Sequence, residues 1–271
     1  MMPAFFVPGE AKCGTTSFYR YLTKHPCLVA ADMKEPATFL KYGASPFFCR
    51  MHYPVAWRSV MAALTGRKCL AGEATANYLA SEKVAAHISA LVPEAKIIIM
   101  MRNPVARAFS DHQMMMVGGW ETEEFNRGVQ LHLRWLGNPE LEPLVRQARM
   151  SGEGFIRFIL RGVYVDNILA WQKYFPKENF LFIKSEEFFA EPQRILNASF
   201  SFLGVDEYSL GDFPVHKKGK YDAGMTRETI LLLSQFYREH NKRLYAVVGR
   251  NLGWESEIEQ QLMSPPGGEV V

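Results

Sequence analysis

The feature of this sequence that most restricts its fold is a glycine-bounded segment near the N-terminus, GEAKCGTTS at residues 9–17. An apolar run, AFFV at 4–7, precedes it, and a segment with helical spacing of apolar residues follows it as far as Pro26. A strand, a glycine loop and a helix in this order turn backbone N–H groups and the positive end of the helix dipole toward one point. The segment therefore predicts an anion-binding turn at the end of a buried strand.

The loop differs from the loop that binds nucleoside triphosphates, whose pattern is G-x-x-x-x-G-K-[ST]. Gly9 and Gly14 fit the frame, but Thr15 occupies the lysine position and Lys12 lies two residues before the second glycine. We expect the amides of 12–17 to hold an anion, with Lys12 able to reach a leaving oxygen. The alternative is an ordinary glycine turn with a solvated lysine.

Short apolar runs alternate with helical segments along most of the chain, and KIIIMM at 96–101 is the strongest strand signal. Strands are expected at 4–7, 68–75, 96–101 and 179–188, the last leaving into a loop, and helices at 16–25, 81–95, 164–175 and 226–248. Ser81 and Asn103-Pro104 are expected to start helices, and Gly249 to end one.

This alternation predicts an α/β fold: a single P-loop-like domain with a central parallel sheet and helices on both faces. The domain is expected to span 1–263, with 117–153 as an insertion near the site and 264–271 as a flexible tail.

A second anion-binding position is predicted where the run 96–101 ends at Arg102. In metal-dependent P-loop enzymes such a strand often ends in an aspartate that helps to hold Mg²⁺. An arginine instead binds an anion directly and would repel a metal. With Ser110 one helical stretch later, the chain presents two anion positions, which suits a ligand with two separate phosphate-type groups. A structural salt bridge for Arg102 and an ordinary helix-surface role for Ser110 are the alternatives.

Composition narrows the class of protein. In 271 residues, 48% are apolar, which is enough for a packed core, and the formal net charge of +3 does not require a nucleic-acid partner. The four cysteines, Cys13, Cys27, Cys49 and Cys69, show neither disulfide-framework nor zinc spacing, so free thiols are expected.

The start of the sequence has no basic leader, and no run of 18 apolar residues predicts a membrane span. We expect either a cytoplasmic protein or a Golgi-lumen domain whose upstream anchor is not part of this sequence. The oligomeric state is not determined by any of these patterns.

Several segments together resemble one enzyme family. They are GEAKCGTTS, KEP, GEATANYL, RNPVARAFSDH, RGVYVDNILAWQKYF, FLFIKSEEFFAEPQRILNASFSFLGV, KKGKY and FYREHNKRL. In order and spacing they are similar to the sulfotransferases that use 3′-phosphoadenosine 5′-phosphosulfate (PAPS), closest to the carbohydrate branch with the heparan sulfate N- and O-sulfotransferases. The resemblance covers about 5–250, nearly the whole chain.

The resemblance implies a role for each cofactor-binding residue. Lys12 matches the lysine that stabilises the bridging oxygen as sulfate leaves, and Arg102 with Ser110 matches the pair that holds the 3′-phosphate. The loop positions that match the 5′-phosphosulfate cradle are Cys13, Gly14, Thr15, Thr16 and Ser17. The positions that match a Lys-Gly-Arg turn over the cofactor phosphates are Lys218, Gly219 and Lys220, followed by Tyr221, which is expected to stack on adenine.

That last turn departs from the family pattern. Lys220 stands where relatives have arginine, so a two-pronged contact with phosphate is lost, and the disulfide that usually braces the turn is absent. Without the resemblance, HKKGKY would read as a basic surface loop.

On the acceptor side, Glu35 after Lys34 matches a general base of the glycosaminoglycan branch, with an exposed loop glutamate as the alternative. Two departures concern this side: Ala37 replaces a histidine of 3-O-sulfating relatives, and Ala74 replaces a frequent lysine. The candidates for the acceptor cleft, each with a structural role as the alternative, are Lys34, Glu73, Tyr78 and His112.

The resemblance implies metal-independent transfer of a sulfuryl group from PAPS to a hydroxyl or amine, with 3′,5′-ADP as the other product. Fixed cations and N–H donors can supply the required electrostatic stabilisation. The acceptor is expected to be a carbohydrate or a small metabolite. A magnesium-dependent P-loop kinase and a catalytically silent nucleotide-binding protein are the competing interpretations.

Overall fold

The structure is a computed structural model that describes residues 2–33, 35–52, 69–138, 157–214 and 224–263. Its contacts divide the chain into two compact units. The first unit comprises Met1–Arg102 and Asn167–Lys217, and the second comprises Asn103–Asp166 and Lys218–Val271. The single domain over 1–263 therefore stays a prediction.

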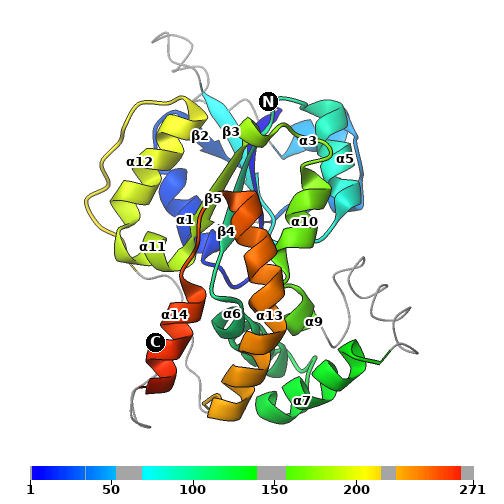
Figure 1. Cartoon of the computed structure of the whole chain (residues 1–271). Coiled ribbons are helices and arrows are strands. Elements are labelled where there is room, and N and C mark those ends of the chain that lie inside the picture. The colour runs from blue at the N-terminus through cyan, green and yellow to red at the C-terminus, as the bar shows by residue number, and fades with distance from the viewer. Residues whose placement is uncertain (1, 34, 53–68, 139–156, 215–223, 264–271) are drawn as a thin grey trace. The chain divides into compact units, whose positions relative to one another are not determined.

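The first unit contains a five-stranded sheet in which every paired strand is parallel to its neighbour. The strands are β1 (Pro3–Gly9), β2 (Leu28–Ala30), β3 (Leu70–Ala74), β4 (Lys96–Met101) and β5 (Phe180–Lys184), in the order β2-β3-β1-β4-β5. Helices lie on both faces, with α1 and α12 on one and α5 on the other (Figure 1). The predicted α/β fold with a central parallel sheet is confirmed.

The helices described in the first unit have at most twelve residues, and α5 begins where the sequence indicates a cap. They are α1 (Thr15–Leu22), α2 (Thr38–Lys41), α3 (Pro46–Met51), α5 (Glu82–Leu91), α11 (Ser185–Ala190) and α12 (Pro192–Leu203), with the 3₁₀ turn η2 (Lys177–Asn179). The predicted cap at Ser81 is confirmed, because its side chain accepts a hydrogen bond from the Val84 N–H at 3.4 Å. Helix α10 (Tyr164–Trp171) crosses the boundary between the two units.

The core of the first unit is built on the two central strands. All residues from Ile97 to Met101 are fully buried, as are Phe5 and Phe6, which explains why their sequence runs are continuously apolar. Gly72 of β3 lies so close to β1 that an added Cβ would be 2.0 Å from the Phe5 ring. A glycine is therefore required where these two strands pack.

The second unit consists of helices in the described residues: α6 (Pro104–Val117), α7 (Phe125–Leu136), α9 (Arg157–Leu160), α13 (Arg227–Val248) and α14 (Trp254–Met263). The predicted start of α6 is confirmed, because Asn103 Oδ1 accepts from the Val105 N–H at 3.1 Å with Pro104 as the first helical residue. The predicted end of α13 is also confirmed, since Gly249 caps it with φ 78°.

One expectation about an element was wrong. The segment 179–188 does not run from a strand into a loop: β5 ends at Lys184 and α11 begins at once. Acidic side chains in the first turn of α11 favour this helix, because they face the positive end of its dipole. Within 117–138, helix α7 is regular, with Phe125, Val129 and His132 buried at helical spacing. The insertion expected at 117–153 stays a prediction.

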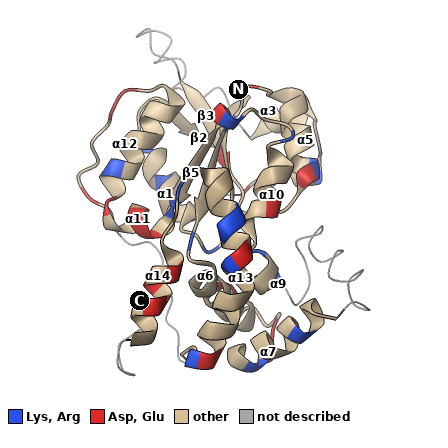
Figure 2. Ribbon diagram, in the orientation of Figure 1, with Lys and Arg blue, Asp and Glu red and all other residues tan. Residues whose placement is uncertain are grey.

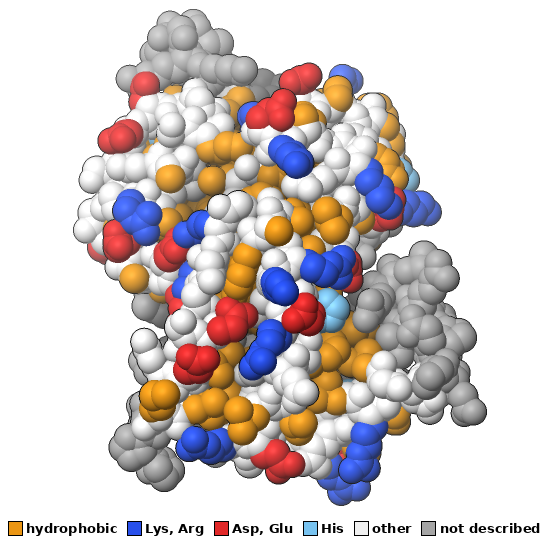
Figure 3. All heavy atoms as spheres, in the orientation of Figure 1, with side chains coloured by type: hydrophobic (Ala, Val, Ile, Leu, Met, Phe, Trp, Pro, Cys, Tyr) orange, Lys and Arg blue, Asp and Glu red, His pale blue; other side chains and the backbone are white. Residues whose placement is uncertain are grey.

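Charged side chains of both signs are mixed along the helices (Figure 2), in agreement with the net charge of +3. On the face in view, the described side chains form no extended area of one sign (Figure 3). No helix in the described part of the chain combines the length and the apolar character needed to cross a bilayer.

Candidate active site

The glycine loop lies where the strand order of the sheet reverses. From β1 the chain first builds β2 and β3 on one side and then β4 and β5 on the other. Ligands of open α/β sheets bind at the carboxyl ends of the strands at such a reversal. β1 ends at Gly9, and the N–H of Glu10 donates to Met100 O of β4 at 2.8 Å. The loop therefore starts beside the end of β4.

The backbone of the loop has the shape of an anion cradle. Lys12 (φ 69°) and Gly14 (φ 78°) are left-handed, and the right-handed helix α1 begins at Thr15. Such a change of hand turns successive N–H groups toward the same point. Gly14 supplies no side-chain cap, and the first amides of a helix have no partner within the helix. The concave side thus presents N–H donors at a positive helix end.

Three hydrogen bonds hold this loop in place. The Cys13 N–H donates to Glu10 O at 3.2 Å, and the Ala11 N–H donates to Glu10 Oε1 at 2.7 Å. The Ser185 hydroxyl, at the start of α11, donates to Cys13 O at 2.6 Å. Ser185 was not among the predicted site residues. The available signal was its position directly after an apolar run, at the same edge of the sheet as Gly9.

Arg102 is the first residue after β4, so it follows the strand that pairs with β1. Its side chain is half-buried. Loop and arginine thus follow the carboxyl ends of adjacent parallel strands, as predicted. Ser110, which is buried, belongs to α6 in the second unit. The pairing of Ser110 with Arg102 on a phosphate stays a prediction.

Glu35 lies beyond the end of β2, with its side chain exposed to solvent. Its φ is 52°, and that of Ala37 is 55°. Left-handed backbone is uncommon for residues other than glycine and is found where surrounding contacts enforce it. Two such contacts are present: the Ala37 N–H donates to Thr75 Oγ1 at 3.4 Å, and the Phe39 N–H donates to the Tyr78 hydroxyl oxygen at 3.0 Å.

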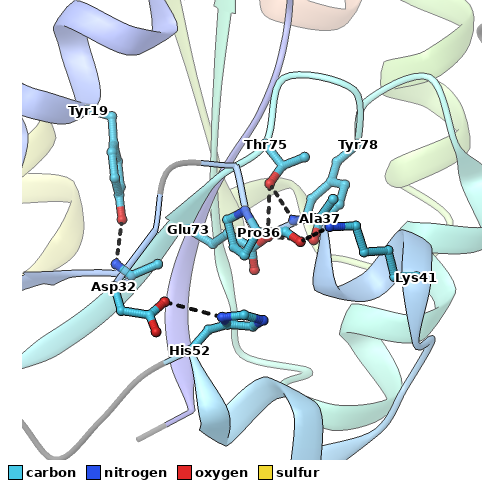
Figure 4. Close-up of polar contacts among 10 residues, drawn as sticks. Tyr19, Asp32, Pro36, Ala37, Lys41, His52, Glu73, Thr75 and Tyr78 are labelled. Atoms are coloured by element: carbon cyan, nitrogen blue, oxygen red, sulfur yellow. Dashed lines mark hydrogen bonds and ion pairs between the residues drawn. The ribbon is translucent and has the colours of Figure 1, made fainter.

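Glu73, at the end of β3, is fully buried beneath this turn (Figure 4). Its Oε1 accepts from Thr75 Oγ1 at 2.9 Å and from the Tyr78 hydroxyl at 2.5 Å. Burial and the Glu73 charge raise the pKa of the Tyr78 hydroxyl, and the same two causes raise the pKa of the Cys49 thiol to about 11. Glu73 and Tyr78 therefore form a buried polar network. Their predicted contact with the acceptor stays a prediction.

His112 lies in the core of the second unit. Its Nε2 is 3.0 Å from Glu123 O, and its ring meets Phe125 and Phe158 edge-on. Burial lowers the pKa of His112, although Glu121 and other nearby carboxylates act in the opposite direction. This packing explains His112 as a core residue, and its acceptor role stays a prediction. The remaining predicted positions, Lys34, Lys218, Gly219, Lys220 and Tyr221, lie outside the described residues.

Residues 3–213 match the family model for the sulfotransferase domain. The chain belongs to the sulfotransferase family. One relative, mouse heparan sulfate glucosamine 3-O-sulfotransferase 3B1, is 26% identical in sequence to this chain. The alignment covers 94% of this chain and 65% of that enzyme. Mouse bifunctional heparan sulfate N-deacetylase/N-sulfotransferase 4 is 25% identical, over 92% of this chain and 30% of that enzyme. The chain therefore spans less than two thirds of these curated relatives.

Among solved structures, this sulfotransferase-family chain is similar to a sulfotransferase from Alicyclobacillus acidocaldarius. The TM-score is 0.71 at 27% identity, and the match covers 94% of this chain and 99% of the other. The predicted family, close to the heparan sulfate branch, is confirmed. The comparisons do not favour the kinase or the catalytically silent alternative.

Proposed function

We propose that the chain transfers the sulfuryl group of PAPS to a hydroxyl or amine of an acceptor. The observation that carries the proposal is the loop at residues 10–17, whose left-handed Gly14 and helix start gather N–H donors beside Lys12. This donor set fits a phosphosulfate, because it supplies amides and one ammonium charge to an anion. When bound, PAPS supplies an activated sulfuryl group attached to a phosphate leaving group.

Lys12 and the loop amides act on the leaving side. The amides bind the 5′ anion and fix its direction, while the Lys12 ammonium neutralises the negative charge that develops on the bridging oxygen. For the 3′-phosphate we propose Arg102 and, from the resemblance, Ser110. The basic turn of Lys218, Gly219 and Lys220 with Tyr221 completes the nucleotide site in this proposal.

Glu35 acts on the acceptor side as the general base. An acceptor O–H or N–H must lose its proton as it attacks, and a carboxylate within hydrogen-bond reach can take it. The Glu35 side chain is exposed, so it is accessible to an acceptor that arrives from solvent.

For the acceptor we propose a carbohydrate or a small metabolite. The mouse 3-O-sulfotransferase is named for heparan sulfate glucosamine, and the mouse N-deacetylase/N-sulfotransferase for heparan sulfate. The alanines at positions 37 and 74, however, remove polar contacts on the acceptor side that the resemblance to that branch would imply. Labelled PAPS offered with an unsulfated heparan oligosaccharide, a glucosamine derivative and 4-nitrophenol would separate the classes.

Thermal unfolding with 3′,5′-ADP, ADP and Mg-ATP tests the nucleotide assignment. We expect 3′,5′-ADP at 100 times its Kd to stabilise the protein by about 2.7 kcal/mol. The effect should be the same in EDTA, since no metal is assigned to the site, and ADP should stabilise less. Lys12→Ala should lose turnover and retain most of the stabilisation by 3′,5′-ADP. A preference for Mg-ATP would overturn the proposal in favour of a kinase.

A further inference from the structure

The turn that carries Glu35 is conformationally costly. Left-handed backbone is strained at a residue other than glycine, and this turn has it at Glu35 and again at Ala37. Such a turn persists only where the surrounding structure holds it. Its direction matters for chemistry, because a base misplaced by about 1 Å loses much of its effect.

Two side-chain hydroxyls from the segment after β3 hold the backbone of the turn at 35–39. Thr75 Oγ1 accepts the Ala37 N–H, and the Tyr78 hydroxyl oxygen accepts the Phe39 N–H. Each hydroxyl has one hydrogen to donate and lone pairs that accept. The group that accepts the hydroxyl hydrogen therefore determines whether the lone pairs of the hydroxyl oxygen point toward the amides of the turn.

Both hydroxyls donate their hydrogen to the same atom, Oε1 of Glu73. An ionised carboxylate is an acceptor only, so it orients both hydroxyls with their lone pairs toward the backbone amides. Glu73 is fully buried and Glu35 is exposed (Figure 4 shows the buried cluster). The two carboxylates therefore have environments suited to different tasks.

We propose that Glu73 is a positioning residue, which fixes the turn bearing Glu35 through Thr75 and Tyr78. The proposal rests on the proposed function, in which Glu35 is the general base. In this proposal Glu73 acts through the two hydroxyls, since its own side chain has no exposed surface in this structure. It acts by holding the Ala37 and Phe39 amides, which fixes the direction of the side chain at position 35.

The structural arm of the test needs no acceptor. Thr75→Val keeps the shape of the side chain and removes the hydroxyl, whereas Thr75→Ser keeps the hydroxyl. Hydrogen exchange by mass spectrometry should show peptides covering 35–41 exchanging about 5-fold faster in Thr75→Val than in wild type, since a lost hydrogen bond of about 1 kcal/mol changes an opening equilibrium about fivefold. Thr75→Ser should exchange as wild type does. Equal exchange in Thr75→Val and wild type would overturn the proposal.

The catalytic arm is a double-mutant cycle with Glu35→Gln. The measured quantity is release of 3′,5′-ADP from PAPS with an unsulfated heparan oligosaccharide present. We expect Thr75→Val to lower kcat about 10-fold with an unchanged KM for PAPS, and to have no further effect in the Glu35→Gln background. Thr75→Ser should restore the rate.

An equal loss of kcat in both backgrounds would show that the network acts elsewhere, and the inference would fall while the function stood. A wild-type protein that neither binds 3′,5′-ADP nor cleaves PAPS would end the proposed function instead. The exchange measurement still reports on the turn in that case, so the two failures are distinguishable.

Discussion

Gly14 shows how much of the loop depends on a single residue. Its φ is 78°, and a Cβ at this position would lie 2.8 Å from the ring of Phe189. Two separate costs therefore oppose any side chain here: backbone strain and contact with an aromatic ring. A glycine at the second position of the frame is predictable from the sequence, whereas the ring contact is not, because Phe189 is distant along the chain.

We expect Gly14→Ala to lower the free energy of unfolding by more than the ~1 kcal/mol of left-handed strain alone and to weaken 3′,5′-ADP binding. Gly204→Ala is the matched control, since Gly204 has φ 70° and nothing within 4 Å of the added Cβ. Urea denaturation of the two variants separates strain from ring contact. Equal losses of stability in both would contradict the role assigned to Phe189.

The acceptor side was less predictable residue by residue. Glu35 was identified only through a motif, and Glu73, Thr75 and Tyr78 were placed together by the fold. The buried carboxylate and its two hydroxyls lie within one short segment, GEATANYL. The backbone amides that the hydroxyls hold, those of Ala37 and Phe39, come from a separate turn of the chain, so the sequence does not show this contact. On the acceptor side, the sequence therefore indicated which residue types take part but not how they are arranged in space.

Among the elements, strands buried on both faces were predicted best. KIIIMM forms β4 with the predicted bounds, because a short, continuous apolar run of this length is typical of a strand buried on both faces. The three-residue β2 was not predicted, since it is too short to carry a periodic signal. Helix α11 was mistaken for a loop because it starts without a break after β5.

Helix α11 is expected to matter for the loop through its first residue. Ser185→Ala removes the hydroxyl that donates to Cys13 O, so the loop should be less well ordered before ligand binds. We expect affinity for 3′,5′-ADP to fall about 5-fold, corresponding to about 1 kcal/mol for one hydrogen bond. Isothermal titration calorimetry measures this directly.

Ser199→Ala is the matched control for that prediction. Ser199 is also buried in the first unit, and its hydroxyl donates to a backbone carbonyl, Ile195 O, at 2.8 Å. Its loss should cost a comparable amount of stability and leave affinity for 3′,5′-ADP unchanged. If both variants bind equally well, Ser185 serves stability alone.

At the scale of the whole molecule, the parallel sheet was predictable and the division into two units was not. The alternation of strands and helices specifies a parallel sheet because each crossover needs a helix. One of the three boundaries between the units falls between Arg102 and Asn103, within one continuous motif, RNPVARAFSDH. No change of composition marks it, so only the contacts of the folded chain reveal it.

The second unit has a polar core that makes its stability depend on pH. Arg107 and Asp111 are fully buried and lie 3.0 Å apart. Burial alone would raise the pKa of Asp111, but Arg107, Arg161 and Arg157 together hold it below its ordinary value. A carboxylate of this kind stabilises the fold above its unfolded pKa of about 3.9, so its contribution is lost only in strong acid.

Two buried histidines of the second unit affect the free energy of unfolding at a higher pH than Asp111 does. Burial lowers the pKa of both His112 and His132 in the folded state. Below the unfolded value of about 6.5, the unfolded chain therefore binds more protons than the folded chain. The free energy of unfolding should fall as the pH drops from 7.5 to 5.5, by at most ~1.4 kcal/mol per histidine per pH unit. This window lies above the range in which Asp111 titrates.

His132→Phe tests the assignment, because the ring of His132 already packs against Phe158 at a centroid distance of 5.1 Å, and phenylalanine keeps that contact without a titrating group. Denaturation at pH 7.5 and 5.5 should show a smaller loss of stability at the lower pH in the variant than in wild type. The pH dependence of stability that remains in the variant then belongs largely to His112. The Nε2 of His112 faces Glu123 O, and protonation of the ring would place a charge among aromatic rings. If the variant and wild type lose equal stability between these pH values, the acid sensitivity arises outside His132.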